Sequence, residues 1–128
     1  MIYLDTSVVL ARLLVEDHAP PAPLWDEFLF SSRLLEYEVW VTLDARKLHR
    51  SHGAAASALL GRVTFTELKP EVLERALEPF PLPVRTLDAL HLASIEFLRG
   101  QGQTVELASY DRRLNAAARA LGIPVVAL

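Results

Sequence analysis

The chain has 128 residues, and this length predicts one compact domain rather than several. With 52% hydrophobic and 23% charged residues, its composition excludes a disordered protein. It has no cysteine, which excludes disulfides, thiolate metal sites and a cysteine nucleophile, and its net charge of −3 at first argues against a protein that binds nucleic acid. There is no apolar run long enough to span a membrane and no signal-like N-terminus, so we expect a cytoplasmic protein.

Strand-like and helix-like segments alternate along the whole chain. In chain order, the predicted elements are a strand at 1–4, a helix at 8–14, a short helix at 24–28, a strand at 29–30, helices at 33–49 and 54–60, a strand at 63–68, helices at 70–77 and 86–98, a strand at 105–108, a helix at 111–121 and a strand at 124–128. Polar residues that can cap the main helices precede them: Thr6 or Ser7, Ser31 or Ser32, Thr86 and Asp111. This alternation predicts an α/β fold, with a parallel sheet and helices on both of its faces.

Acidic residues stand where the predicted strands end and helices begin. Asp5 follows the first strand, Asp88 lies in the first turn after Thr86, and Asp111 follows the strand at 105–108. In open parallel sheets, chemistry gathers beyond the carboxyl ends of the strands. Helix capping is an alternative role for Asp88 and Asp111. It is a weaker one for Asp5, because Thr6 or Ser7 can cap the helix that follows.

The helix predicted at 33–49 offers a fourth acid, and helical periodicity favours one of two candidates. At 100° per residue, Glu38 falls close to Leu34 and Val41, at the edge of the apolar arc. Glu36 falls on the other side, near Lys47. Glu38 is therefore the acid predicted to turn toward the interior, although a side chain at the edge of the arc can also reach water.

Clustered carboxylates repel one another and either take up protons or recruit cations. Oxygen ligands without cysteine suit hard ions such as Mg²⁺ or Mn²⁺. These ions polarise phosphoryl oxygens and activate water, so the four acids point to hydrolysis of phosphodiester bonds.

Four segments, in order, resemble the motifs of the PIN-domain ribonucleases, most closely the VapC-type toxins of VapBC toxin–antitoxin pairs. They are IYLDTS at 2–7, SRL at 32–34 followed by Glu38, LDALHLAS at 87–94 and SYDRRL at 109–114. The resemblance covers essentially the whole chain, so residues 1–128 are expected to form a single PIN domain. It implies a three-layer α/β/α fold with a central parallel sheet of about five strands.

The resemblance also implies a Mg²⁺- or Mn²⁺-dependent endoribonuclease that hydrolyses RNA with metal-activated water. Carried over residue by residue, Asp5, Glu38, Asp88 and Asp111 would be both the catalytic residues and the metal ligands. A shift of the second motif onto Glu36 stays open. The family further implies a cognate antitoxin protein as partner and a homodimer.

Several other side chains have both a functional and a structural interpretation. A hydroxyl from Thr6, Ser7 or Ser109 would orient a carboxylate or a water. Helix capping or turn formation is the alternative for all three, and it is the favoured role for Ser7. His91, three residues after Asp88, is interpreted as a hydrogen-bonded helix histidine rather than a general acid or base. The basic residues that would hold RNA phosphates, or form solvated helix faces, are Arg46, Lys47, Arg50, Arg112 and Arg113.

Two other functions remain open. One is a PIN-like module that binds RNA or protein without catalysis, and the other is a PIN nuclease of RNA processing. The net charge does not exclude the nuclease, because adding four neutralised carboxylates to −3 gives +1. The excess of negative charge thus lies in the predicted site, and we expect the protein to bind RNA weakly when no metal is bound.

Overall fold

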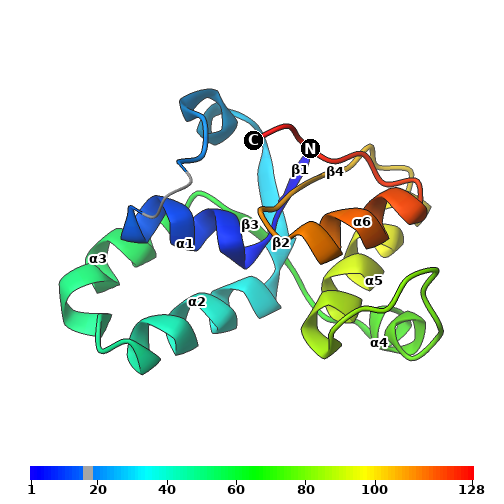
Figure 1. The fold of residues 1–128 in the computed structure, drawn as a ribbon, viewed down its shortest axis with the longest axis horizontal. Coiled ribbons are helices and arrows are strands. Elements are labelled where there is room, and N and C mark those ends of the chain that lie inside the picture. Colours follow the sequence, from blue (N-terminus) through cyan, green and yellow to red (C-terminus); the bar gives the residue numbers. More distant parts are fainter. Residues whose placement is uncertain (16–18) are drawn as a thin grey trace.

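A computed structural model of the protein describes residues 1–15 and 19–128. Its centre is a sheet of parallel strands in the order β3–β2–β1–β4. The strands are β1 (Ile2–Leu4), β2 (Leu29–Ser32), β3 (Thr64–Thr66) and β4 (Glu106–Ala108). Each is short and lies near the middle of the domain (Figure 1). The predicted α/β fold with a parallel sheet is confirmed.

Helices cover both faces of this sheet. They are α1 (Thr6–Leu14), the 3₁₀ helix η1 (Ala22–Asp26), α2 (Arg33–Ala45), α3 (His49–Leu60), α4 (Pro70–Ala76), α5 (Thr86–Gly100) and α6 (Arg112–Ala120). Figure 1 shows α1, α2 and α3 grouped on one side of the strands and α4, α5 and α6 on the other. The result is the expected three-layer arrangement.

The alternation of side chains along β1 divides the core into two parts. Ile2 and Leu4 belong to one buried cluster, with residues of α1, α2 and α3. Tyr3, between them, belongs to a second cluster with Leu92 of α5 and Leu114 of α6. Successive side chains of a strand point to opposite faces, so this three-residue strand joins both helical layers to the sheet.

The fifth predicted strand, at 124–128, is reduced to one parallel bridge between Leu107 and Val125. Two hydrogen bonds hold it: Leu107 N–H donates to Pro124 O at 2.8 Å, and Val126 N–H donates to Leu107 O at 2.8 Å. Pro124 has no N–H with which to extend the ladder. In the described part of the chain the sheet therefore has four strands, one fewer than expected.

The helix predicted at 33–49 ends earlier than its sequence suggests. The segment breaks after Ala45, and Lys47 adopts a left-handed backbone with φ 59° before α3 begins at His49. Leu48 N–H closes this turn on Leu43 O at 2.8 Å. No glycine or proline marks the break, which is why the sequence pattern did not reveal it. The turn lets α3 fold back against α1 and α2.

Helix starts also differ in detail from the prediction. Asp111 caps α6 as predicted, with its side chain accepting two backbone N–H groups. Arg85, not Thr86, occupies the N-cap position of α5, and Thr86 is the first helical residue. Ser32 precedes α2 without a capping hydrogen bond from its side chain, while Ser31 donates its hydroxyl to Leu4 O at 2.8 Å.

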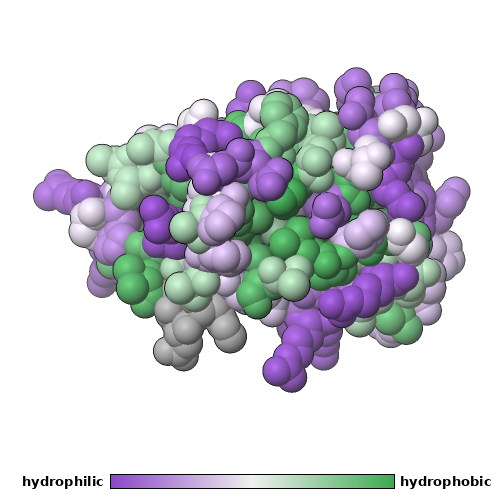
Figure 2. All heavy atoms as spheres, turned by 90° about the horizontal axis from the view of Figure 1, so that it is seen from above, coloured by the Kyte–Doolittle hydropathy of each residue, from purple (hydrophilic) through white to green (hydrophobic). Residues whose placement is uncertain are grey.

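Among the helices that the structure describes, none is both long and apolar enough to cross a membrane. The face seen from above in Figure 2 mixes hydrophobic and hydrophilic side chains. A location in the cytoplasm stays a prediction.

Candidate active site

One cavity brings together all four acidic side chains predicted from the sequence. It has a volume of about 670 Å³, and its lining includes Asp5, Glu38, Asp88 and Asp111. Glu38 lies in α2 and Asp88 in the first turn of α5, while the other two acids follow β1 and β4. Those two strands are parallel neighbours, joined at their ends by Asp5 N–H donating to Ala108 O at 3.0 Å. Parallel pairing therefore brings Asp5 and Asp111 to the same edge of the sheet.

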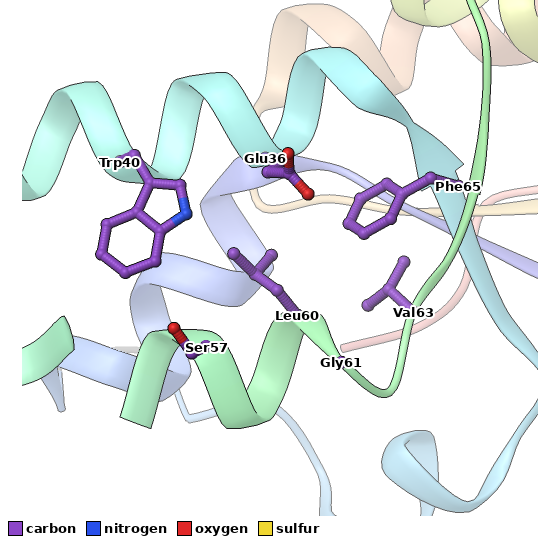
Figure 3. Close-up of a pocket in the computed structure, with 7 residues that line it drawn as sticks. All are labelled: Glu36, Trp40, Ser57, Leu60, Gly61, Val63 and Phe65. Carbon is purple, nitrogen blue, oxygen red and sulfur yellow. The ribbon is translucent and has the colours of Figure 1, made fainter. Parts of the chain in front are cut away.

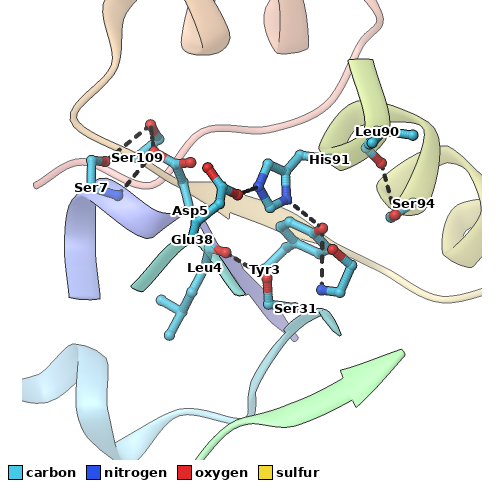
Figure 4. A network of polar contacts seen from close by, with 11 residues as sticks. Tyr3, Leu4, Asp5, Ser7, Ser31, Glu38, Leu90, His91, Ser94 and Ser109 are labelled. Carbon is cyan, nitrogen blue, oxygen red and sulfur yellow. Dashed lines mark hydrogen bonds and ion pairs between the residues drawn. The ribbon is translucent and has the colours of Figure 1, made fainter. Parts of the chain in front are cut away.

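Two serine hydroxyls hold the buried carboxylate of Asp5. Its Oδ2 accepts hydrogen bonds from Ser7 Oγ at 2.6 Å and from Ser109 Oγ at 2.8 Å (Figure 4). The same oxygen accepts the backbone N–H of Ser7 at 3.3 Å, so that Asp5 caps α1. The prediction that Thr6 or Ser7 caps this helix is therefore wrong, because the Asp5 carboxylate itself takes a free N–H of the first turn.

Each serine hydroxyl is fixed from its other side. Ser7 Oγ accepts the backbone N–H of Tyr110 at 2.9 Å, and Ser109 Oγ accepts that of Asp111 at 2.9 Å. Both hydroxyl protons are then directed at Asp5, which orients its carboxylate. The hydroxyl of Thr6 is buried without a hydrogen-bond partner in the described part of the chain. Of the three hydroxyls considered from the sequence, Ser7 and Ser109 therefore contact Asp5 and Thr6 does not, although capping was the favoured role for Ser7.

Asp88 is the acid whose ionised form the site tolerates least. Burial raises its pKa above the usual value, and repulsion from Asp111 and Asp5 raises it further. A hydrogen bond from the backbone of Arg85 and the nearby His91 act in the opposite direction. Among the described residues, nothing donates to its buried Oδ2. This oxygen lacks the partner that a buried polar atom needs.

Asp111 combines a cap with a place in the cavity. Its Oδ1 accepts the backbone N–H of Arg113 at 2.9 Å and of Leu114 at 3.2 Å. Both roles considered from the sequence, cap and cavity acid, therefore meet in one side chain.

The cap and the charge of Asp111 can be separated by mutation. Asp111→Asn keeps an oxygen that accepts the same two N–H groups, so we expect its stability to stay near that of the wild type. Asp111→Ala loses the cap and should lower the free energy of unfolding by about 1 kcal/mol. Urea unfolding of both variants checks this, and equal destabilisation by the two substitutions would refute the capping role.

Glu38 is held by a chain of hydrogen bonds that links α2 to α5 and β1. Its Oε1 lies 2.6 Å from His91 Nε2, and His91 Nδ1 lies 2.8 Å from the hydroxyl of Tyr3 (Figure 4). The backbone N–H of Ser32 donates to that hydroxyl oxygen at 3.2 Å. His91 is only 1% exposed, and both of its ring nitrogens have partners. This confirms the interpretation of His91 as a hydrogen-bonded helix histidine.

The pKa of His91 is raised to about 10. Burial by itself lowers it, but Tyr3, the hydrogen-bonded carboxylate of Glu38 and the nearby Asp5 together outweigh burial. At neutral pH the ring is an imidazolium, which donates from both nitrogens. The Glu38 carboxylate is thereby paired with a positive charge in the interior.

Glu36 lies apart from the other acids. It pairs with Arg33 at 3.2 Å, both side chains being half exposed. Figure 3 shows it in another pocket, formed with side chains of α2, α3, β3 and the segment before β3, among them Trp40 and Phe65. Of the two candidates weighed from the sequence, only Glu38 lines the cavity of the three aspartates.

The predicted apolar arc of α2 needs a correction. The fully buried stripe of this helix is Leu35, Val39 and Leu43. Val41, placed by periodicity on the inner face beside Glu38, is 45% exposed, and Tyr37 is 62% exposed. Both line the acidic cavity instead, so this face of α2 turns toward the site rather than the core.

The donor set of the cavity fits a hard divalent cation. Its acids offer only oxygen, the negative charges raise the pKa of Asp88, and Asp88 Oδ2 has no partner among the described residues. Within the described ranges, no three Asp, Glu or His side chains are close enough together to hold a metal ion.

The predicted basic residues fall into two places. Arg46, Lys47 and Arg50 lie exposed around the turn between α2 and α3, and none of them lines the acidic cavity. Arg112 and Arg113 are exposed at the start of α6. Sequence reasoning missed Arg85, which does line the acidic cavity. Its position three residues before Asp88 was the available signal.

Comparison with known proteins agrees with this geometry. Residues 2–124 match the PIN domain family. Ribonuclease VapC46 of Mycobacterium tuberculosis (strain ATCC 25618 / H37Rv) is 33% identical over 134 residues, covering 98% of this chain and 96% of the relative. Ribonuclease VapC35 of the same strain is 29% identical over 131 residues, covering 99% and 96%. A chain in a toxin–antitoxin complex from Klebsiella pneumoniae shares the fold, with a TM-score of 0.64 at 18% identity over 99% of this chain and 97% of that one. The protein therefore belongs to the PIN domain family, together with VapC ribonucleases.

Proposed function

We propose that this protein is a metal-dependent endoribonuclease, the toxin of a toxin–antitoxin pair. The observation that carries the proposal is that Asp5, Glu38, Asp88 and Asp111, distant in sequence, line one cavity. The near full-length similarity to proteins named VapC ribonucleases supports RNA as the substrate. The similarity to a chain in a toxin–antitoxin complex agrees with the fold of such a toxin.

In this mechanism the four acids would hold Mg²⁺ or Mn²⁺. When bound, the ion neutralises the carboxylates, polarises a phosphoryl oxygen and lowers the pKa of water. Ser7 and Ser109 orient Asp5, and the His91 imidazolium orients Glu38, so that two of the acids are fixed before substrate arrives. Arg85, at the rim of the same cavity, offers a positive charge to the RNA backbone. No protein nucleophile is required.

The chain provides a matched pair of acids that tests the site. Glu38→Gln removes a carboxylate from the cavity and should lower the rate of RNA cleavage at least about 100-fold. Glu36→Gln lies two residues away on the same helix, in a different pocket, and should leave the rate within about threefold. Cleavage is measured on single-stranded RNA with Mn²⁺ and with a chelator. Equal loss in both variants would contradict the assignment of Glu38.

The same assays distinguish this proposal from the two other functions, a PIN-like module without catalysis and a nuclease of RNA processing. Mn²⁺-dependent cleavage that Asp5→Asn abolishes supports the nuclease. RNA binding with neither metal binding nor cleavage would instead indicate a PIN-like module without catalysis. An antitoxin-like reading frame immediately upstream distinguishes a toxin from a nuclease of RNA processing.

The proposal includes a cognate antitoxin and a homodimer in the cytoplasm. Apolar side chains at the mouth of the cavity support a protein partner: Tyr37, Val41 and Leu87 are 62%, 45% and 39% exposed. Exposed apolar groups gathered around a functional cavity are typical of a surface that another protein covers.

A further inference from the structure

A second cleft adjoins the acidic cavity. It has a volume of about 390 Å³ and is lined by Leu82, Pro83, Val84, Arg85, Arg113 and Ala116. Arg85 lines both cavities, so they meet at its side chain. The cleft lies between the loop before α5 and the first turns of α6, the two helices whose starts carry Asp88 and Asp111.

The two arginines of this cleft carry charges that the protein does not neutralise. Within the described part of the chain, neither Arg85 nor Arg113 lies within salt-bridge distance of a carboxylate. Arg75, by contrast, pairs with Glu96 at 2.7 Å. Both cleft arginines are exposed at the edge of a site whose own charges are negative. An anionic ligand that approaches the four acids needs these positive charges beside it.

The rest of the cleft is apolar and stiff. Leu82 is 41% exposed, and Val84 and Ala116 complete the wall. Prolines at 79, 81 and 83 restrict the backbone of the loop that carries this wall. An apolar wall beside two guanidinium groups matches the two chemical parts of a nucleotide, because the base is a flat weakly polar ring and the phosphate is an anion.

We propose that this cleft is a subsite for the nucleotide next to the cleaved phosphodiester. Its phosphate lies on Arg85 and Arg113, and its base lies on Leu82 and Val84. A base reaches such a wall only when it is unstacked, so the substrate is single-stranded RNA. This subsite rests on the proposed ribonuclease function and adds to it the surface that contacts the nucleotide beside the cleaved bond.

RNA binding tests the arginines. In an Asp88→Asn background, which prevents cleavage, Arg85→Gln and Arg113→Gln are each expected to weaken binding of a fluorescent single-stranded oligonucleotide about tenfold at low salt. Each should also lower the slope of log affinity against log salt by about 0.7, the value for one phosphate contact. Arg119→Gln, an exposed arginine on the same helix that lines neither cavity, is the control and should change neither quantity.

Cleavage of a randomised RNA pool tests the apolar wall. Leu82→Ser should reduce the base preference at the position beside the cut, as read from the sequenced ends. Leu77→Ser, which replaces a leucine that is 87% exposed and lines neither cavity, should leave that preference unchanged.

The outcomes separate the subsite from the proposed function. If wild-type protein cleaves RNA but the Arg85, Arg113 and Leu82 variants behave like their controls, the subsite is overturned and the nuclease stands. If wild-type protein cleaves no RNA, the nuclease fails, and loss of binding in the two arginine variants alone still supports a nucleotide cleft. Binding equal to that of Arg119→Gln overturns the subsite in either case.

Discussion

Asp88→Asn is expected to abolish RNA cleavage and, at the same time, to stabilise the metal-free protein. The substitution removes a charge that burial and the neighbouring Asp111 and Asp5 disfavour. The amide oxygen can still accept the hydrogen bond from the backbone of Arg85. The free energy of unfolding should rise by about 0.5–1 kcal/mol. The effect is small because water partly screens the charge of this half-buried side chain.

The sign of the effect follows from the direction of the pKa shift. The folded protein binds the Asp88 proton more tightly than the unfolded chain, whose pKa is near 3.8. The carboxylate therefore lowers stability as the pH rises above 3.8, and the cost reaches its full size above the raised pKa of the folded state. The advantage of Asp88→Asn should be present at pH 7 and vanish below pH 3.8.

Thermal unfolding at pH 7, with a chelator and then with Mn²⁺, measures this effect. Wild-type protein should gain more from Mn²⁺ than the variant, because a bound cation offsets the repulsion that Asp88→Asn removes. Glu36→Gln, which changes an exposed acid outside the cavity, should show neither the gain with chelator nor the reduced response to metal. A lower unfolding temperature for Asp88→Asn with chelator would refute this account of the site.

The largest loss of stability is expected for His91→Ala. The substitution leaves the Glu38 carboxylate and the Tyr3 hydroxyl without their partner in the interior. Breaking a buried ion pair by removing one member costs about 3–5 kcal/mol. His49 is the matched control, because it also pairs with a carboxylate, that of Asp44 at 2.8 Å, but is largely exposed. His49→Ala should cost less than about 1 kcal/mol in urea unfolding, and similar losses for the two histidines would refute the network.

The same network makes stability depend on pH. The pKa of His91 is about 10 in the folded protein, against 6.5 for an unperturbed histidine. The folded state therefore holds the proton more tightly, and the stabilisation is complete below pH 6.5 and lost as the pH rises through 10. The titratable groups near the ring are Tyr3, Glu38, Asp5 and Asp88. Urea unfolding of metal-free protein between pH 6.5 and 10 should show this decline, and His91→Ala should lack it.

The sequence alone was sufficient for the fold class and for finding most of the acids that line the cavity. Short apolar runs alternating with amphipathic ones predict a parallel sheet between two helical layers, because each layer must bury its apolar face. Acids placed just beyond predicted strands must meet, since the carboxyl ends of parallel strands share one edge. Asp5 and Asp111 were found in this way, Asp88 was found at the start of the helix predicted at 86–98, and all three line the cavity.

Glu38 shows where a local pattern reaches its limit. Periodicity places Glu36 and Glu38 on opposite flanks of the buried stripe of α2, and both flanks touch water. Only the packing of α2 against its neighbours decides that the Glu38 flank faces the aspartates and the Glu36 flank faces α3. The pattern favoured Glu38, which does line the cavity, but its reason was wrong. Periodicity placed Glu38 beside residues expected in the core, and Tyr37 and Val41 of that face line the cavity instead.

What only the tertiary structure decided are the contacts between residues far apart in the chain. The bond from Ser109 to Asp5 joins positions 104 apart, and the one from His91 to Glu38 joins positions 53 apart. No periodicity encodes such pairs, because their geometry depends on how whole layers pack. The same holds for the break after Ala45 and for the cleft that meets the acidic cavity at Arg85. The sequence by itself therefore determined which acids line the cavity, and the packing of the layers determined what holds them and what lies beside them.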